Sequence, residues 1–282
     1  MPAHMSEPEI VWPANAILGE GPVWDPRAAA LYWVDIKACR LHRFTPSTGA
    51  KESWTSAEPV GCIAAPAPDG TMLAATRSGF ASLKPGRDGR VARTALCSPE
   101  AGRFPANRFN DGKIAPDGSF WAGTMDDAEQ ADTGGWWRFD PRTGTADLLE
   151  TGYRVTNGPA FDAERGRVYL TDSARQTVFA ADWIKGGGFE NKRVFLQFND
   201  GDGYPDGMQV FADGSLWIAF WDGACLRQVS PDGDILSVVP LPMKRPTSLA
   251  FAPELKRIFV TSAAIGLKAD GIEGSLAQLR WA

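Results

Sequence analysis

The chain repeats one arrangement of hydrophobic and polar positions six times. Each copy has a hydrophobic stretch, a turn with Pro, Asp or Gly, and a second stretch in which Trp, Tyr or Phe alternates with small or polar residues. Such alternation around a tight turn predicts a β-hairpin. The copies are GPVWDPRAAALYWVD from Gly21, CIAAPAPDGTMLAAT from Cys62, GKIAPDGSFWAGT from Gly112, GPAFDAERGRVYLTD from Gly158, GMQVFADGSLWIAF from Gly207 and SLAFAPELKRIFVTS from Ser248.

The spacing of these hairpins predicts the fold. Successive turn residues lie 41 to 51 residues apart, at Asp25, Asp69, Asp117, Asp162, Asp213 and Glu254. Further strands fit in each interval, such as LHRFTPSTG from Leu41 and WWRFDPRTG from Trp136. A repeat of this length with about four strands is typical of a β-propeller blade. We therefore predict an all-β, six-bladed propeller forming a single domain over residues 1–282, in preference to a β-sandwich or two small β domains.

Polar residues recur at one position of this repeat, immediately before the hairpin. Four copies have a carboxylate or an amide there, followed closely by Gly, at Glu20, Asn110, Asn157 and Asp206. Because the innermost strand of each blade lines the central channel, these side chains are expected to meet at one mouth of it. Each could also be an ordinary turn residue, but their coincidence in four copies favours a shared site.

The chemistry of these four residues predicts a site for a divalent metal ion. All four offer oxygen atoms, which are the ligands that hard cations such as Ca²⁺, Mg²⁺ and Mn²⁺ prefer. Three or four protein ligands would leave positions for water or substrate, so the site would be open.

Composition and charge exclude several other classes of protein. Two His, His4 and His42, rule out a His-rich zinc site, and a Ser-His-Asp triad would have to use one of them. His4 lies in MPAHM, which resembles vector-derived sequence ahead of a native start at Met5. The four Cys form no C-x-x-C pair and predict ordinary thiols in a reducing compartment. With 29 basic and 34 acidic residues and no basic stripe, a nucleic acid partner is not expected.

The sequence also lacks the signals of a membrane protein. No apolar run approaches the roughly 18 residues that span a bilayer, and no signal-peptide pattern opens the chain. We expect a cytoplasmic protein without membrane contact, a monomer or weak homo-oligomer, that acts on a small molecule. No G-x-G-x-x-G joins a strand to a helix, which argues against a dehydrogenase.

The motifs around the predicted site resemble those of the gluconolactonase and senescence-marker-protein family, which includes regucalcin and bacterial sugar lactonases. The matching segments are LGEGPVWD, LYWVDI, RFNDGKIAPDGSFWAGTM, TNGPAF and YPDGMQVFADGSLWIAFW. The resemblance implies a six-bladed propeller that hydrolyses sugar-acid lactones with one divalent metal ion, which is Ca²⁺, Zn²⁺, Mn²⁺ or Fe²⁺ in different relatives. It implies metal ligation by Glu20, Asn157 and Asp206, with Asp206 also acting as the general base. It further implies that Arg108 and Asn110 contact the substrate.

The acidic segment after Met125 departs from the family pattern. Regucalcin-like relatives carry a substrate-binding Glu soon after G-T-M, whereas this chain has Asp126-Asp127-Ala128-Glu129. We expect Asp127 to contact the substrate, within a mobile acidic loop at the mouth.

Cations near the mouth suggest a substrate class. Arg108, Arg154 and Lys244-Arg245 each precede a hairpin, and we expect Arg154 to contact the substrate. These side chains would suit an anionic substituent on the sugar, such as a phosphate or a sulfonate. The alternative is ordinary surface charge.

Two other functions fit the same features. A metal ion beside a carboxylate also suits a phosphotriesterase-like hydrolase, and a fully coordinated ion would suit a non-catalytic calcium-binding propeller. The sugar itself is not encoded in a motif, since specificity is expected to depend on loops around Met125–Trp136, Asp200–Tyr204 and Trp221.

Overall fold

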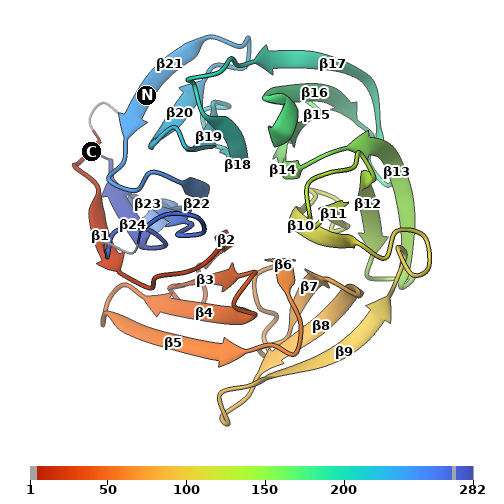
Figure 1. Cartoon of the computed structure of the whole chain (residues 1–282), viewed down its shortest axis with the longest axis horizontal. Coiled ribbons are helices and arrows are strands. Elements are labelled where there is room, and N and C mark those ends of the chain that lie inside the picture. The colour runs from red at the N-terminus through yellow and green to blue at the C-terminus, as the bar shows by residue number, and fades with distance from the viewer. Residues whose placement is uncertain (1–4, 269–270, 282) are drawn as a thin grey trace.

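The chain forms a ring of six sheets around a central channel (Figure 1). The computed structural model describes residues 5–268 and 271–281, and in this part of the chain 24 strands form six antiparallel sheets of four strands each. The predicted all-β, six-bladed propeller is confirmed. The interpretation of residues 1–4, including His4, as vector-derived lies outside the described residues.

Five blades take four consecutive strands, with the first strand of each nearest the channel (Figure 1). Blade 1 contains β2 (Gly19–Asp25), β3 (Ala30–Asp35), β4 (Arg40–Thr45) and β5 (Ala50–Thr55). Blade 2 contains β6 (Val60–Ile63), β7 (Met72–Thr76), β8 (Gly79–Pro85) and β9 (Val91–Cys97). Blade 3 contains β10 (Asn107–Ile114), β11 (Phe120–Asp126), β12 (Gly134–Asp140) and β13 (Thr145–Tyr153). Blade 4 contains β14 (Thr156–Asp162), β15 (Arg167–Asp172), β16 (Thr177–Trp183) and β17 (Phe189–Gln197). Blade 5 contains β18 (Tyr204–Val210), β19 (Leu216–Trp221), β20 (Cys225–Val229) and β21 (Ile235–Pro240).

Blade 6 joins the two ends of the chain. It contains β22 (Pro246–Ala252), β23 (Arg257–Ser262) and β24 (Leu276–Arg280), and its outer strand is β1 (Glu9–Trp12), which pairs antiparallel with β24. The ring is therefore closed by backbone hydrogen bonds between the first and the last strand. The two helices of the described residues, η1 (Ser173–Arg175) and η2 (Pro253–Leu255), are single 3-10 turns, and neither could cross a membrane.

Three of the predicted hairpin turns share one local mechanism. In the D-G-S or D-G-T turns at 69–71, 117–119 and 213–215, the Asp carboxylate accepts hydrogen bonds from the backbone N–H and the hydroxyl two residues later. At Asp117 these bonds are 3.0 and 2.6 Å long, and at Asp213 they are 2.9 and 2.6 Å long. The middle glycine has a positive φ, 85° at Gly118, which a side chain would disfavour. The turn sequence thus fixes where each inner strand ends.

Large aromatic side chains pack adjacent blades together. At some junctions, an aromatic residue on the second strand of one blade contacts an aromatic residue on the inner strand of the next. Trp121 meets Phe161 edge-on at 5.2 Å between ring centroids, and Trp217 meets Phe251 at 6.2 Å. Trp121 and Trp217 are both fully buried, and each such side chain buries on the order of 150–250 Å². The aromatic residues that alternate in the sequence therefore pack between neighbouring blades.

His42 belongs to this packing. It lies on β4, stacked on Trp33 at 4.1 Å, and its Nδ1 lies 2.7 Å from the Ser53 hydroxyl. Burial, together with repulsion from Arg40, lowers the pKa of His42 to about 4. The imidazole is therefore a neutral core side chain, and it does not line the cavity described below.

Candidate active site

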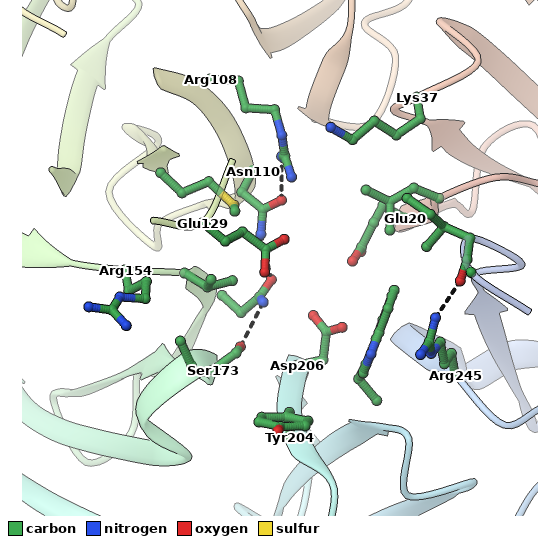
Figure 2. Close-up of a pocket in the computed structure, with 18 residues that line it drawn as sticks. Glu20, Lys37, Arg108, Asn110, Glu129, Arg154, Ser173, Tyr204, Asp206 and Arg245 are labelled. Carbon is green, nitrogen blue, oxygen red and sulfur yellow. Dashed lines mark hydrogen bonds between the residues drawn. The ribbon is translucent and has the colours of Figure 1, made fainter. Parts of the chain in front are cut away.

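A cavity of about 540 Å³ opens at one mouth of the channel (Figure 2). Blades 1, 3, 4, 5 and 6 contribute to its wall. Its polar lining residues are Glu20, Lys37, Arg108, Asn110, Glu129, Arg154, Asn157, Ser173, Tyr204, Asp206 and Arg245. The four residues that the repeat position predicted to converge, Glu20, Asn110, Asn157 and Asp206, all lie on this wall.

Backbone irregularities aim these residues at the cavity. The pairing of each inner strand with its neighbour shifts register at the polar position, between Glu20 and Val23 in β2 and between Pro205 and Met208 in β18. Such bulges break the regular alternation of side chains and are frequent beside active sites. A glycine is needed after Asp206, because a Cβ on Gly207 would collide with the side chain of Ser248 in the next blade.

Three buried carboxylates lie near one another, and two of them, Glu20 and Asp206, line the cavity. Glu20, Asp111 and Asp206 are 3%, 2% and 5% exposed, and Asp206 Oδ1 has no hydrogen-bond partner. Burial, followed by repulsion from Asp111, raises the pKa of Glu20 to about 8. Burial, followed by repulsion from Glu20 and Asp111, raises the pKa of Asp206 well above its usual range. Without a bound cation, these buried carboxylates therefore keep their protons to a higher pH than exposed carboxylates do.

A divalent cation fits this charge pattern. It would neutralise the buried carboxylates and give the free Asp206 oxygen a partner. Among the described residues, no group of three His, Cys, Asp or Glu side chains could hold a metal ion. The candidate set instead combines the carboxylates of Glu20 and Asp206 with the amide oxygen of Asn157, and all three line the cavity.

A chain of hydrogen bonds along the cavity wall includes the candidate ligand Asn157. Arg108 Nη1 donates to Asn110 Oδ1 at 2.6 Å, and Asn110 Nδ2 donates to Asn157 Oδ1 at 3.0 Å. Asn157 Nδ2 donates to Ser173 Oγ at 2.8 Å, and Ser173 donates to the Pro205 carbonyl at 2.6 Å. The polar atoms of Arg108 and Asn110 thus mainly contact the protein.

The acidic loop places Glu129, not Asp127, on the cavity wall. In Figure 2 the carboxylates of Glu20, Glu129 and Asp206 point toward the middle of the cavity. Asp127 instead accepts from Lys37 Nζ and Arg108 Nε, each at 2.6 Å. Glu129 has a left-handed backbone with φ of 59°, a conformation that the sequence did not reveal. The acidic run after Met125 was the available signal, but it did not tell which acid turns inward.

The cations at the mouth are paired with aspartates. Arg154 Nε donates to Asp132 at 2.8 Å, and Arg154 lines the cavity as expected. Arg245 Nε donates to Asp222 at 2.7 Å, and its guanidinium lies 4.7 Å from the ring centre of Trp221. Sequence reasoning did not identify Lys37 or Ser173, since each reaches the wall from a loop that follows a second strand.

Comparisons with known proteins identify the family of this chain. The family model described as the SMP-30/gluconolactonase/LRE-like region matches residues 18–264. The chain is 35% identical over 260 residues to the pentonolactonase XacC of Haloferax volcanii, covering 91% of this chain and 84% of that protein. It is 32% identical over 250 residues to the 6-deoxy-6-sulfogluconolactonase of Pseudomonas putida, covering 88% and 84%. Among solved structures, the luciferin-regenerating enzyme superposes with a TM-score of 0.89 at 26% identity, covering 97% of this chain and 94% of that one. By sequence and by fold, the chain belongs to the SMP-30/gluconolactonase/LRE-like family.

Proposed function

We propose that this protein hydrolyses the lactone of a sugar acid to the open-chain acid, with a divalent metal ion at the mouth of the channel. The observation that carries this proposal is the convergence of Glu20, Asn157 and Asp206 in one cavity, with Asp206 Oδ1 lacking a hydrogen-bond partner. Two relatives that align over most of the chain are named as lactonases, which supports the reaction class.

Glu20, Asn157 and Asp206 are the residues that would hold the metal ion. When bound, a divalent cation supplies a Lewis acid that polarises the lactone carbonyl and stabilises the charge that develops on its oxygen. The carboxylate of Asp206, which lines the cavity, would accept the proton of the attacking water. The water oxygen bonds to the carbonyl carbon, the bond from that carbon to the ring oxygen breaks, and the ring oxygen takes up the proton from Asp206.

The cavity suits a monosaccharide lactone. Its volume of about 540 Å³ lies within the range of small-molecule sites. We propose that Arg154 and Glu129 bind the sugar hydroxyls, while Asn110 and Asp127 hold Arg108 in place on the same wall. Because Arg108, Arg154 and Arg245 already pair with aspartates, we propose an uncharged lactone as the substrate rather than one with an anionic substituent.

The test is proton release in weak buffer with a pH indicator. Metal-stripped protein would be assayed on neutral aldonolactones and on one 6-phosphorylated analogue, with Ca²⁺, Mg²⁺, Mn²⁺, Zn²⁺ or anaerobic Fe²⁺ added singly. We expect metal-dependent hydrolysis above the spontaneous rate, faster on a neutral lactone. A faster rate on the charged analogue would contradict the proposed substrate class. Metal binding without turnover of any lactone would contradict the proposed reaction and favour a phosphotriesterase-like or calcium-binding role.

A further inference from the structure

We propose that Ser173 is a positioning residue, which holds the amide of Asn157 with its oxygen available to the metal ion. The inference rests on the proposed metal site, and it concerns a residue that neither the repeat nor the family motifs identified. Ser173 lies on η1, at the start of the loop after β15, and it is 7% exposed. Its hydroxyl connects Asn157 in blade 4 with the Pro205 carbonyl in blade 5, next to Asp206.

An amide side chain must be oriented before it can serve as an oxygen ligand. The oxygen and nitrogen of Asn occupy nearly equivalent positions, so a rotation of the amide by half a turn would present two N–H donors instead of an acceptor. An N–H donor cannot coordinate a cation. The orientation of Asn157 therefore decides whether the site has three oxygen ligands or two.

The hydrogen bonds of Ser173, at the Pro205 end of the chain, fix the orientation of the Asn157 amide from one side. The Pro205 carbonyl can only accept, so the Ser173 hydroxyl proton is committed to it, at 2.6 Å. Ser173 Oγ can then only accept from Asn157, and the atom 2.8 Å away must be the Nδ2 donor. Asn157 Oδ1 accordingly lies on the opposite side of the amide.

The hydrogen bonds at the Arg108 end of the chain favour the same orientation of the Asn157 amide. The Arg108 guanidinium can only donate, so Asn110 turns its oxygen to Arg108 Nη1 at 2.6 Å. Asn110 Nδ2 then donates both of its hydrogens, to the Thr156 carbonyl at 2.8 Å and to Asn157 Oδ1 at 3.0 Å. Asn157 Oδ1 keeps a second lone pair free for a cation.

Burial makes this chain act as a unit. Arg108, Asn110 and Asn157 are at most 5% exposed, so water cannot readily replace a broken hydrogen bond. Removing the Ser173 hydroxyl leaves Asn157 Nδ2 without its acceptor, so that only the hydrogen bond from Asn110 still holds the amide. Outer partners of metal ligands typically contribute about 10- to 100-fold in metal affinity.

The direct test is calorimetric titration of metal-stripped protein with Mn²⁺. We expect Ser173→Ala to weaken Mn²⁺ binding by about 10- to 100-fold. Thermal melting should show that the metal-free variant remains folded. Ser215→Ala is a matched control: its buried hydroxyl also accepts from an amide, Gln228 Nε2 at 3.0 Å, and donates to Asp213 at 2.6 Å. It should bind Mn²⁺ like the wild type.

A double-mutant cycle identifies the mechanism. In Asn157→Asp both side-chain atoms facing the cavity and Ser173 are oxygens, so orientation no longer matters. Ser173→Ala should then have little further effect on Mn²⁺ affinity. Equal losses in the wild-type and Asn157→Asp backgrounds, or unchanged affinity in Ser173→Ala, would overturn the positioning role. A wild-type protein that binds neither Mn²⁺ nor Ca²⁺ would instead refute the proposed metal site.

Discussion

At the scale of single residues, the free oxygen of Asp206 has the most direct consequence. We predict that Asp206→Asn lowers turnover of a neutral lactone by about 100- to 10,000-fold, the usual contribution of a general base. The same substitution should leave the metal-free protein at least as stable as the wild type, because it removes one of three mutually repelling buried carboxylates. Turnover and thermal melting in the presence of a chelator measure the two effects. Asp213→Asn, in a turn of the same blade, should retain full turnover, and an active Asp206→Asn protein would remove Asp206 as the base.

His42 makes stability depend on pH. Its folded-state pKa of about 4 lies below that of an exposed imidazole, about 6.5, so the unfolded chain takes up the proton first. The contribution of His42 is therefore complete above about pH 6.5 and is lost as the pH falls toward 4. Between pH 7.5 and 5.0, the wild type should lose about 2 kcal/mol more unfolding free energy than His42→Phe. Urea unfolding at both pH values checks this, and equal losses would show that His42 is not buried in its neutral form.

The residues of the candidate site differ in how far the sequence revealed them. Glu20, Asn157 and Asp206 could be predicted because the repeat places them at one position of separate blades. Glu129 could not, since its inward direction depends on a left-handed backbone in a loop. Ser173 could not either, because its role arises from a contact with Asn157 across 16 residues of chain. The repeat therefore predicts the site residues at positions that the blades share, but not those in loops that differ from blade to blade.

At the scale of elements, the packing of the bulged inner strand β18 determines the position of Asp206. Gly207 lies where β18 meets the Ser248 side chain of blade 6. We predict that Gly207→Ala destabilises the protein by about 1–3 kcal/mol, the usual effect of overpacking, and also weakens Mn²⁺ binding because Asp206 is displaced. Chemical unfolding and metal titration provide the two measurements. Gly187→Ala is the control, since its Cβ would meet Ile184 alone, with Cγ2 the nearest atom at 3.2 Å. Equal behaviour of the two variants would contradict this account of the bulge.

Many strand boundaries could be predicted from the sequence, because local interactions determine them. Aspartate-glycine turns, such as Asp117-Gly118, mark strand ends through local hydrogen bonds. Strand β1 was not predicted as part of blade 6, because its pairing with β24 depends on the ring closing and not on any local pattern.

At the scale of the whole molecule, β1 stabilises the ring as a unit. Besides pairing with β24, it carries Trp12, which lies edge-on to Trp33 at 5.4 Å and to His42 at 5.1 Å in blade 1. We predict that deleting residues 1–12 lowers the melting temperature by about 10 °C or more, corresponding to several kcal/mol in a chain of this size. It should also promote association, because the edge of β24 becomes exposed. Calorimetry and light scattering test this, with Trp12→Phe as a milder control. A truncated protein that melts like the wild type would show that ring closure does not depend on β1.

The closing strand also has a consequence for biosynthesis. Gln278 donates to Glu9 across 269 residues of chain, so β1 is synthesised long before its partner strand β24. At roughly 5–20 residues per second, that partner arrives only after tens of seconds. Five blades can assemble during translation while β1 waits unpaired, and the mouth that joins blades 1, 5 and 6 is completed at the end. Chains that terminate before β24 should therefore leave β1 unpaired and blade 6 incomplete, so the part of the cavity wall that contains Arg245 and Ile265 is the last to form.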